Sequence, residues 1–129
     1  MSAASDYLEN KLLDHTLGNT AYTQPGNFVG LYTADTGLEA NSPSAELSGS
    51  GYARQAGSFA AASGGSCSTD ATITFPAATG NWGTITHVAV LDASTSGNVL
   101  FWGAVTSSKT IETGDTFQIS SGNLTITLA

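Results

Sequence analysis

Residues 84–105 read TITHVAVLDASTSGNVLFWGAV, and this stretch decides the fold. Two apolar runs, rich in β-branched and aromatic residues, flank a central run of small polar residues at 92–98. Such a pattern is typical of two antiparallel strands joined by a short connection. We therefore predict a hairpin with strands at 84–91 and 99–105. The residues that we expect to contribute to the core are Val88, Val90, Phe101 and Trp102.

Further short runs extend this β pattern over most of the chain. They contain β-branched or aromatic residues, and turn-forming Gly, Ser, Asn and Asp separate them. They cover residues 28–32, 52–59, 71–75, 116–119 and 124–128. The last run alternates, with Leu124, Ile126 and Leu128 on one face, as a half-buried strand does. This series predicts a mainly β protein, an antiparallel β-sandwich over residues 28–128, for which a jelly-roll-like form is one option.

Residues 3–17 are predicted to form one amphipathic α-helix ahead of the sandwich. Ala4, Leu8 and Leu12 are spaced by four, which places them on one face of a helix. Gly18 suits the left-handed conformation that ends many helices. So short a helix is marginal alone, and its apolar side needs a partner surface. The helix residues that we expect at an interface, within the chain or with another subunit, are Leu8, Leu12 and Leu13.

Two long segments, residues 33–51 and 60–70, are predicted to be surface loops. Both consist mainly of small and polar residues, so we expect neither to supply side chains to the core. The chain has 129 residues and shows no linker and no internal repeat. We therefore expect a single domain over residues 1–129.

The composition limits the classes of partner. The chain contains 18 Thr, 16 Ser and 15 Gly, and its formal net charge is −7. Its few cations, Lys11, Arg54 and Lys109, are scattered, whereas phosphate binding needs clustered positive charge. We therefore expect no nucleic acid and no membrane surface as a partner. The sequence also lacks an export signal and an apolar run long enough to span a membrane.

The residues that carry chemistry form no catalytic motif. The two histidines, His15 and His87, fall on the predicted helix and in a predicted strand, and we expect His87 to pack beside Trp82. No nucleophile elbow, phosphate loop or dinucleotide fingerprint is present. Cys67 is the single cysteine and supports neither an internal disulfide nor a zinc site. We therefore predict no catalytic residue, no metal and no cofactor.

Acidic and aromatic residues leave two weaker alternatives. The carboxylates of Glu112 and Asp115 are three positions apart, a spacing that favours a turn over a catalytic pair. Loop oxygens of Asp35, Glu39 and Asn41 do not fit the EF-hand spacing for calcium. The two tryptophans, Trp82 and Trp102, are typical of sugar-stacking sites, but we favour packing for both.

Several short blocks resemble a family of small virion proteins of tailed bacteriophages, the minor tail or tail-fibre proteins. The resemblance extends from Tyr7 to Leu128. The blocks that carry it are residues 12–15 (LLDH), 19–23 (NTAYT), 29–33 (VGLYT), 51–55 (GYARQ), 73–76 (ITFP), 82–87 (WGTITH), 97–100 (GNVL) and 121–125 (SGNLT). The resemblance implies a non-enzymatic structural protein and no catalytic residues.

This resemblance leads to specific expectations about partners. We expect other phage virion proteins as partners, either of the tail or the major capsid protein, and assembly of several copies in the host cytoplasm into the virion. A place on the tail is slightly favoured, and capsid decoration and a glycan-binding adhesion module are the alternatives. Arg54 follows a glycine-rich turn, and we expect it to pair with an acidic group of a neighbouring strand or subunit.

Overall fold

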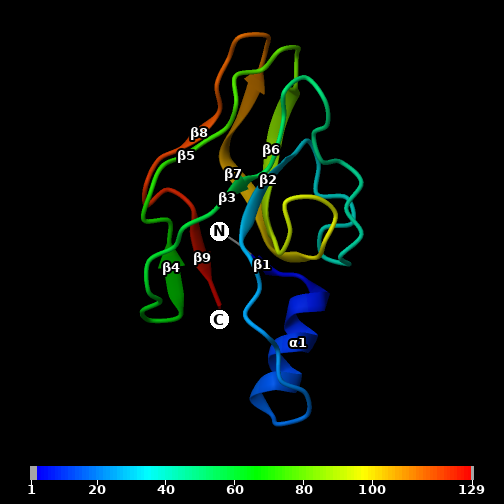
Figure 1. Cartoon of the computed structure of the whole chain (residues 1–129), viewed down its shortest axis with the longest axis vertical. Coiled ribbons are helices and arrows are strands. Elements are labelled where there is room, and N and C mark those ends of the chain that lie inside the picture. The colour runs from blue at the N-terminus through cyan, green and yellow to red at the C-terminus, as the bar shows by residue number, and fades with distance from the viewer. Residues whose placement is uncertain (1–2, 129) are drawn as a thin grey trace.

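The computed structural model describes residues 3–128, which form a mainly β protein with one helix (Figure 1). The elements in chain order are β1 (Ala3–Ala4), α1 (Asp6–Thr16), β2 (Phe28–Tyr32), β3 (Gln55–Ala56), β4 (Ser66–Ser68), β5 (Ile73–Thr74), β6 (Gly83–Leu91), β7 (Val99–Ile111), β8 (Gln118–Ile119) and β9 (Thr125–Thr127). The β-rich fold with a helix near the N-terminus confirms the predicted fold class.

The predicted hairpin forms the centre of a five-stranded antiparallel sheet with the order β1-β7-β6-β2-β3. The β6 and β7 strands are joined by a turn in which the Asp92 N–H donates to the Asn98 carbonyl over 3.1 Å. The Asp92 carboxylate also accepts the Asn98 N–H over 2.6 Å. A Cβ at Gly97, where φ is +74°, would lie 2.5 Å from that carboxylate, so this tight turn requires glycine.

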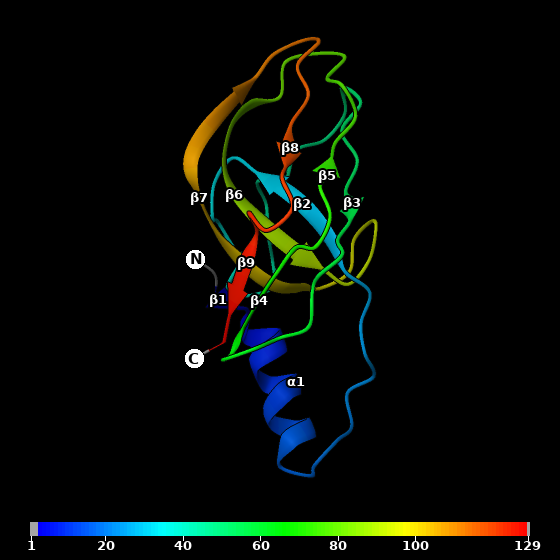
Figure 2. The same cartoon turned by 90° about the vertical axis from the view of Figure 1, so that its left-hand side faces the viewer.

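Two small antiparallel ladders, β4–β9 and β5–β8, form a second layer over one face of this sheet (Figure 2). Each ladder has two strands and is smaller than the sheet of a jelly roll. The largest core cluster lies between the layers. It comprises Val29, Leu31, Leu47, Ile73, Phe75, Ala78, Trp82, Ile85, Val88, Ile111 and Phe117. Burial between two layers is what the alternating strand patterns predict.

The opposite face of the main sheet is covered by the segment 33–51. Leu38 from this segment is fully buried and packs with Tyr32, Leu91 and Val99 of the sheet. Leu47 is also buried, and its N–H donates to the Leu31 carbonyl over 3.1 Å. The prediction that this segment supplies no side chains to the core was wrong, because its two leucines are enough to anchor it on the sheet.

The strand bounds differ from the prediction wherever a run lies outside the central hairpin. Of the predicted strand 52–59 only Gln55–Ala56 is a strand, and of 71–75 only Ile73–Thr74 is one. The predicted loop 60–70 contains β4, whose polar residues pair with β9. These short pairings depend on distant partner strands, which local sequence patterns do not specify.

Strand β7 is longer than predicted because it bends away from β6 and then rejoins it. His87 pairs with Ala104 and Ile85 pairs with Lys109, so one β6 residue, Thr86, lies opposite four β7 residues, 105–108. A bulge of this kind increases the bend and twist of a strand, and Figure 2 shows β7 strongly curved. The strand pattern of the sequence ends at Val105, where this bulge begins.

The helix is shorter than the predicted range 3–17. It begins after Ser5, whose hydroxyl accepts the Leu8 N–H over 3.3 Å and donates to the Val99 carbonyl. The preceding residues Ala3–Ala4 pair with β7 instead, so pairing with the sheet outweighs their helix propensity. Gly18, with φ of +83°, follows the helix as predicted. In residues 3–128, no helix combines the length and apolar character needed to cross a membrane.

Candidate interaction surface

Arg54 forms an ion pair with Glu46 of its own chain. The Arg54 Nε donates to Glu46 Oε2 and the Nη2 donates to Glu46 Oε1, each over 2.7 Å. The side chains are only 7% and 23% exposed, respectively. The predicted pairing of Arg54 with an acidic group is thus present, with a partner on the loop 33–51 rather than on a neighbouring strand. A bidentate pair of this kind fixes both side chains in one geometry.

The same cluster connects three parts of the chain. The Arg54 Nη1 donates to the carbonyls of Ala93 and Ser96 in the β6–β7 turn, over 2.8 and 2.7 Å. The Tyr52 hydroxyl donates to Glu46 Oε2 over 2.7 Å and accepts the Leu31 N–H over 3.0 Å. The hydrogen bond to Glu46 raises the pKa of Arg54, and burial raises the pKa of Tyr52. We interpret this cluster as a stabilising feature of the fold.

Tyr22 predicts how stability changes in alkaline solution. Burial raises the pKa of its hydroxyl from 10.0 to about 12, so the folded state binds the proton more tightly than the unfolded state. Its contribution is therefore fully present below pH 10 and is lost as the pH rises from 10 to 12. We expect the free energy of unfolding in urea to fall over this interval, and Tyr22→Phe to make the fall less steep. An equal slope for both proteins would contradict the assignment.

The candidate catalytic residues remain apart from one another. His15 Nδ1 accepts the Tyr22 N–H over 3.0 Å near the C-terminal end of α1. His87 lies beside Trp102, with ring centres 6.3 Å apart, and not beside Trp82 as predicted, because neighbouring strands of the sheet carry both rings. Asp115 accepts the Glu112 N–H over 2.9 Å and thus stabilises a turn, as predicted. No nucleophile, base and orienting acid meet among the side chains that these contacts describe.

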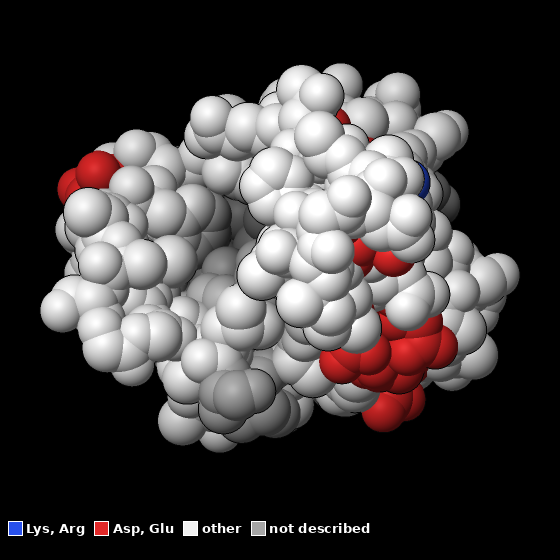
Figure 3. All heavy atoms as spheres, turned by 90° about the horizontal axis from the view of Figure 1, so that it is seen from below, with Lys and Arg blue, Asp and Glu red and all other residues white. Residues whose placement is uncertain are grey.

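Exposed carboxylates gather near the start of α1. Oxygens of Asp6, Glu9 and Glu39 lie within 4.8 Å of one another, and Figure 3 shows an acidic surface in the view from below. Of the three loop residues considered for calcium, only Glu39 belongs to this group. The Asn41 side chain instead accepts the Val99 N–H over 2.7 Å. Glu39 also accepts the Trp102 indole N–H over 2.8 Å, so this carboxylate has a structural role.

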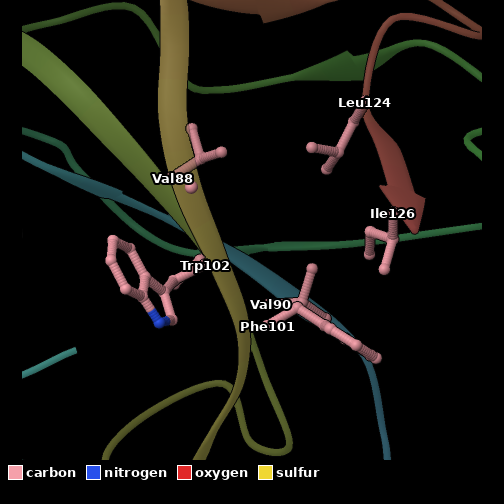
Figure 4. A pocket seen from close by; sticks show the side chains of 8 residues that line it. Val88, Val90, Phe101, Trp102, Leu124 and Ile126 are labelled. Atoms are coloured by element: carbon pink, nitrogen blue, oxygen red, sulfur yellow. The ribbon is translucent and has the colours of Figure 1, made fainter. Parts of the chain in front are cut away.

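Both tryptophans pack within the fold, as favoured from the sequence. Trp82 is buried, and its indole N–H donates to the Ser50 carbonyl over 2.9 Å. Trp102 is half-buried and packs with the cluster around Leu38. Figure 4 shows the Trp102 ring on the opposite side of β7 from Leu124 and Ile126. Neither ring lies on an open face suited to stacking on a sugar.

The largest exposed apolar side chains lie on α1 and at the end of β9. Leu13, Leu17 and Leu128 are 58%, 77% and 52% exposed, whereas Leu8 is buried and Leu12 is half-buried. Of the three predicted helix residues, Leu8 therefore packs within the chain and Leu13 faces solvent. Leu17 and Leu128 were not among the predicted interface residues, although the helical spacing of Leu13 and Leu17 is visible in the sequence.

Two clefts border these leucines. One, of about 560 Å³, is lined by residues of β1 and α1 and by Leu128. The other, of about 320 Å³, is mostly apolar, and its wall includes Phe59, Phe101, Ile126 and again Leu128. Figure 3 shows the molecule hollowed at this end. A cluster of exposed leucines beside an apolar cleft is typical of an interaction surface.

Comparison with known families identifies the chain. The family described as "Podophage GP4 fiber I protein gp80" matches residues 3–127. No curated protein matches the chain. Because the family match covers nearly the whole chain, the protein belongs to this phage fibre family and is a virion component.

Proposed function

We propose that this member of the podophage fibre family is a non-enzymatic structural subunit, present in several copies in the tail fibre and assembled there in the host cytoplasm. The observation that carries the proposal is the family match over residues 3–127. The dispersed histidines and the structural use of Glu39, Asp115 and both tryptophans support a building block over an enzyme or a lectin.

The candidate site residues have different roles in this proposal. Arg54 and Glu46 hold the loop 33–51 against the β6–β7 turn and give each subunit a fixed shape. Leu8 attaches α1 to the sheet, and Leu12 packs beside it. Leu13 remains exposed and is available for a contact with another virion protein. The surface is rich in Ser, Thr and Gly, which lose little side-chain entropy when subunits pack together.

Imaging of intact phage particles tests the proposal. We expect cryo-electron microscopy to locate the density of this chain in the tail fibre, in several copies, because the family is a fibre family. Density spread over the capsid lattice would support a decoration protein instead. Absence of the chain from purified particles, checked by mass spectrometry, would contradict any structural role in the virion.

A further inference from the structure

We propose that two copies of this chain associate through the end that carries α1, each placing its exposed Leu13 and Leu17 in the apolar cleft of the other. This inference deepens the proposed function, on which it rests, by naming a second copy as the partner of the exposed helix surface. It also assigns a role to two residues, Leu17 and Leu128, that the fold alone does not explain.

The projecting part of the contact is the exposed side of α1. Leu13 and Leu17 are four residues apart, so their side chains lie on the same side of the helix. They are 58% and 77% exposed, and Leu128, the third strongly exposed leucine, borders the same cleft as Leu13. Within residues 3–128, these are the large hydrophobic side chains exposed by more than half. Their concentration at one end indicates a surface that another protein covers.

The receiving part of the contact is the cleft of about 320 Å³ between the main sheet and the β4–β9 ladder. Its walls include Phe59, Cys67, Phe101 and Ile126, and no charged residue lines it. Leu128 lines both this cleft and the cleft beside α1, so the two clefts adjoin. The apolar lining suits leucine side chains and offers no partner to a charged segment.

The charges of α1 favour a second copy in the antiparallel orientation. Asp6 and Glu9 lie in its first turn, His15 lies in its last turn, and Lys11 lies between them. In the described part of the chain, Lys11 has no carboxylate partner and sits over the Tyr7 ring. An antiparallel neighbour brings the acidic end of each helix beside the basic side chains of the other, and it also opposes the helix dipoles.

A two-fold arrangement follows from where these parts lie. The leucines and the cleft are on the same end of the molecule, so one contact satisfies both on both copies. Such an isologous contact closes after two subunits. It also covers Leu128 of each copy, which borders both clefts.

A disulfide cross-link tests this geometry directly. The chain has one cysteine, Cys67, which lines the receiving cleft. In the variant Leu17→Cys, mild oxidation is expected to link the new thiol to Cys67 of the partner subunit and give a species of twice the chain mass on non-reducing electrophoresis. Adding Cys67→Ser should strongly reduce this species. Ser107→Cys, at an exposed position of β7, is the matched control and should give little of it.

The oligomeric state provides the second test. The unmodified chain is expected to sediment as a dimer, and Leu13→Asp with Leu17→Asp as a monomer with an unchanged circular dichroism spectrum, because both side chains lie outside the core. Thr106→Asp, at another exposed position, should leave the dimer intact. A monomeric or trimeric unmodified chain, or a Leu17→Cys disulfide within one chain, would overturn the inference. Particle imaging would still decide the fibre role separately.

Discussion

Replacing Arg54 with methionine is expected to lower the free energy of unfolding by about 3–5 kcal/mol, because it leaves the Glu46 carboxylate without its partner. The guanidinium is 7% exposed and makes four hydrogen bonds, two to Glu46 and two to the β6–β7 turn. Methionine fills part of the volume but donates no hydrogen bond. Glu46 is still held by Tyr52, yet the hydroxyl alone does not neutralise its charge.

Urea unfolding of a double-mutant cycle measures this effect. Adding Glu46→Leu to Arg54→Met removes the orphaned charge, so the double variant should recover part of the lost stability. Lys109→Met is the matched control, since Lys109 is exposed on β7, and it should change the stability by less than about 0.5 kcal/mol. If Arg54→Met and Lys109→Met had equal effects, the cluster around Glu46 would not stabilise the fold.

The sequence predicts this cluster only in part. Arg54 was recognisable as a pairing residue because it is a rare cation after a glycine-rich turn. Its partner was not, because Glu46 lies on a loop whose position depends on contacts with the sheet. Carboxylates are found throughout that loop and elsewhere, and local spacing does not distinguish between them. The choice of partner is thus a tertiary property.

The central hairpin was predictable because its information is local. Residues 84–105 carry both strands and the turn between them, and the structure forms β6 and β7 there. The short strands differ because each is defined by a partner far along the chain. Ala3–Ala4 has a helical pattern but pairs with β7, and the polar β4 pairs with β9. In both cases long-range pairing outweighs local propensity.

The apolar cleft was not predictable for the same reason. Phe59, Phe101 and Ile126 come from distant parts of the sequence, and the packing of the β4–β9 ladder over the sheet brings them together. The exposed side of α1 was closer to prediction, because a helical pattern shows which residues share a face. It does not show which face docks on the sheet, and here Leu8 docks while Leu13 faces solvent.

The second large effect is expected at Leu38, which lies in a segment that resembles a surface loop. Leu38→Ala should lower the free energy of unfolding by about 2–5 kcal/mol, because it leaves a cavity among buried side chains. Leu38 is fully buried against Tyr32, Leu91 and Val99 on the face of the sheet opposite the two ladders. Urea unfolding, monitored by tryptophan fluorescence and circular dichroism, measures the change.

Leu17→Ala is the matched control, since it removes the same atoms from a side chain that is 77% exposed. At a protein concentration low enough to keep subunits apart, it should change the stability by less than about 0.5 kcal/mol. A small effect at both positions would mean that the loop 33–51 contributes little to the core. A large effect at Leu38 alone would establish that a segment of mostly small and polar residues forms the second hydrophobic face of the sheet. Burial of two leucines, rather than overall polarity, then determines whether such a segment belongs to the core.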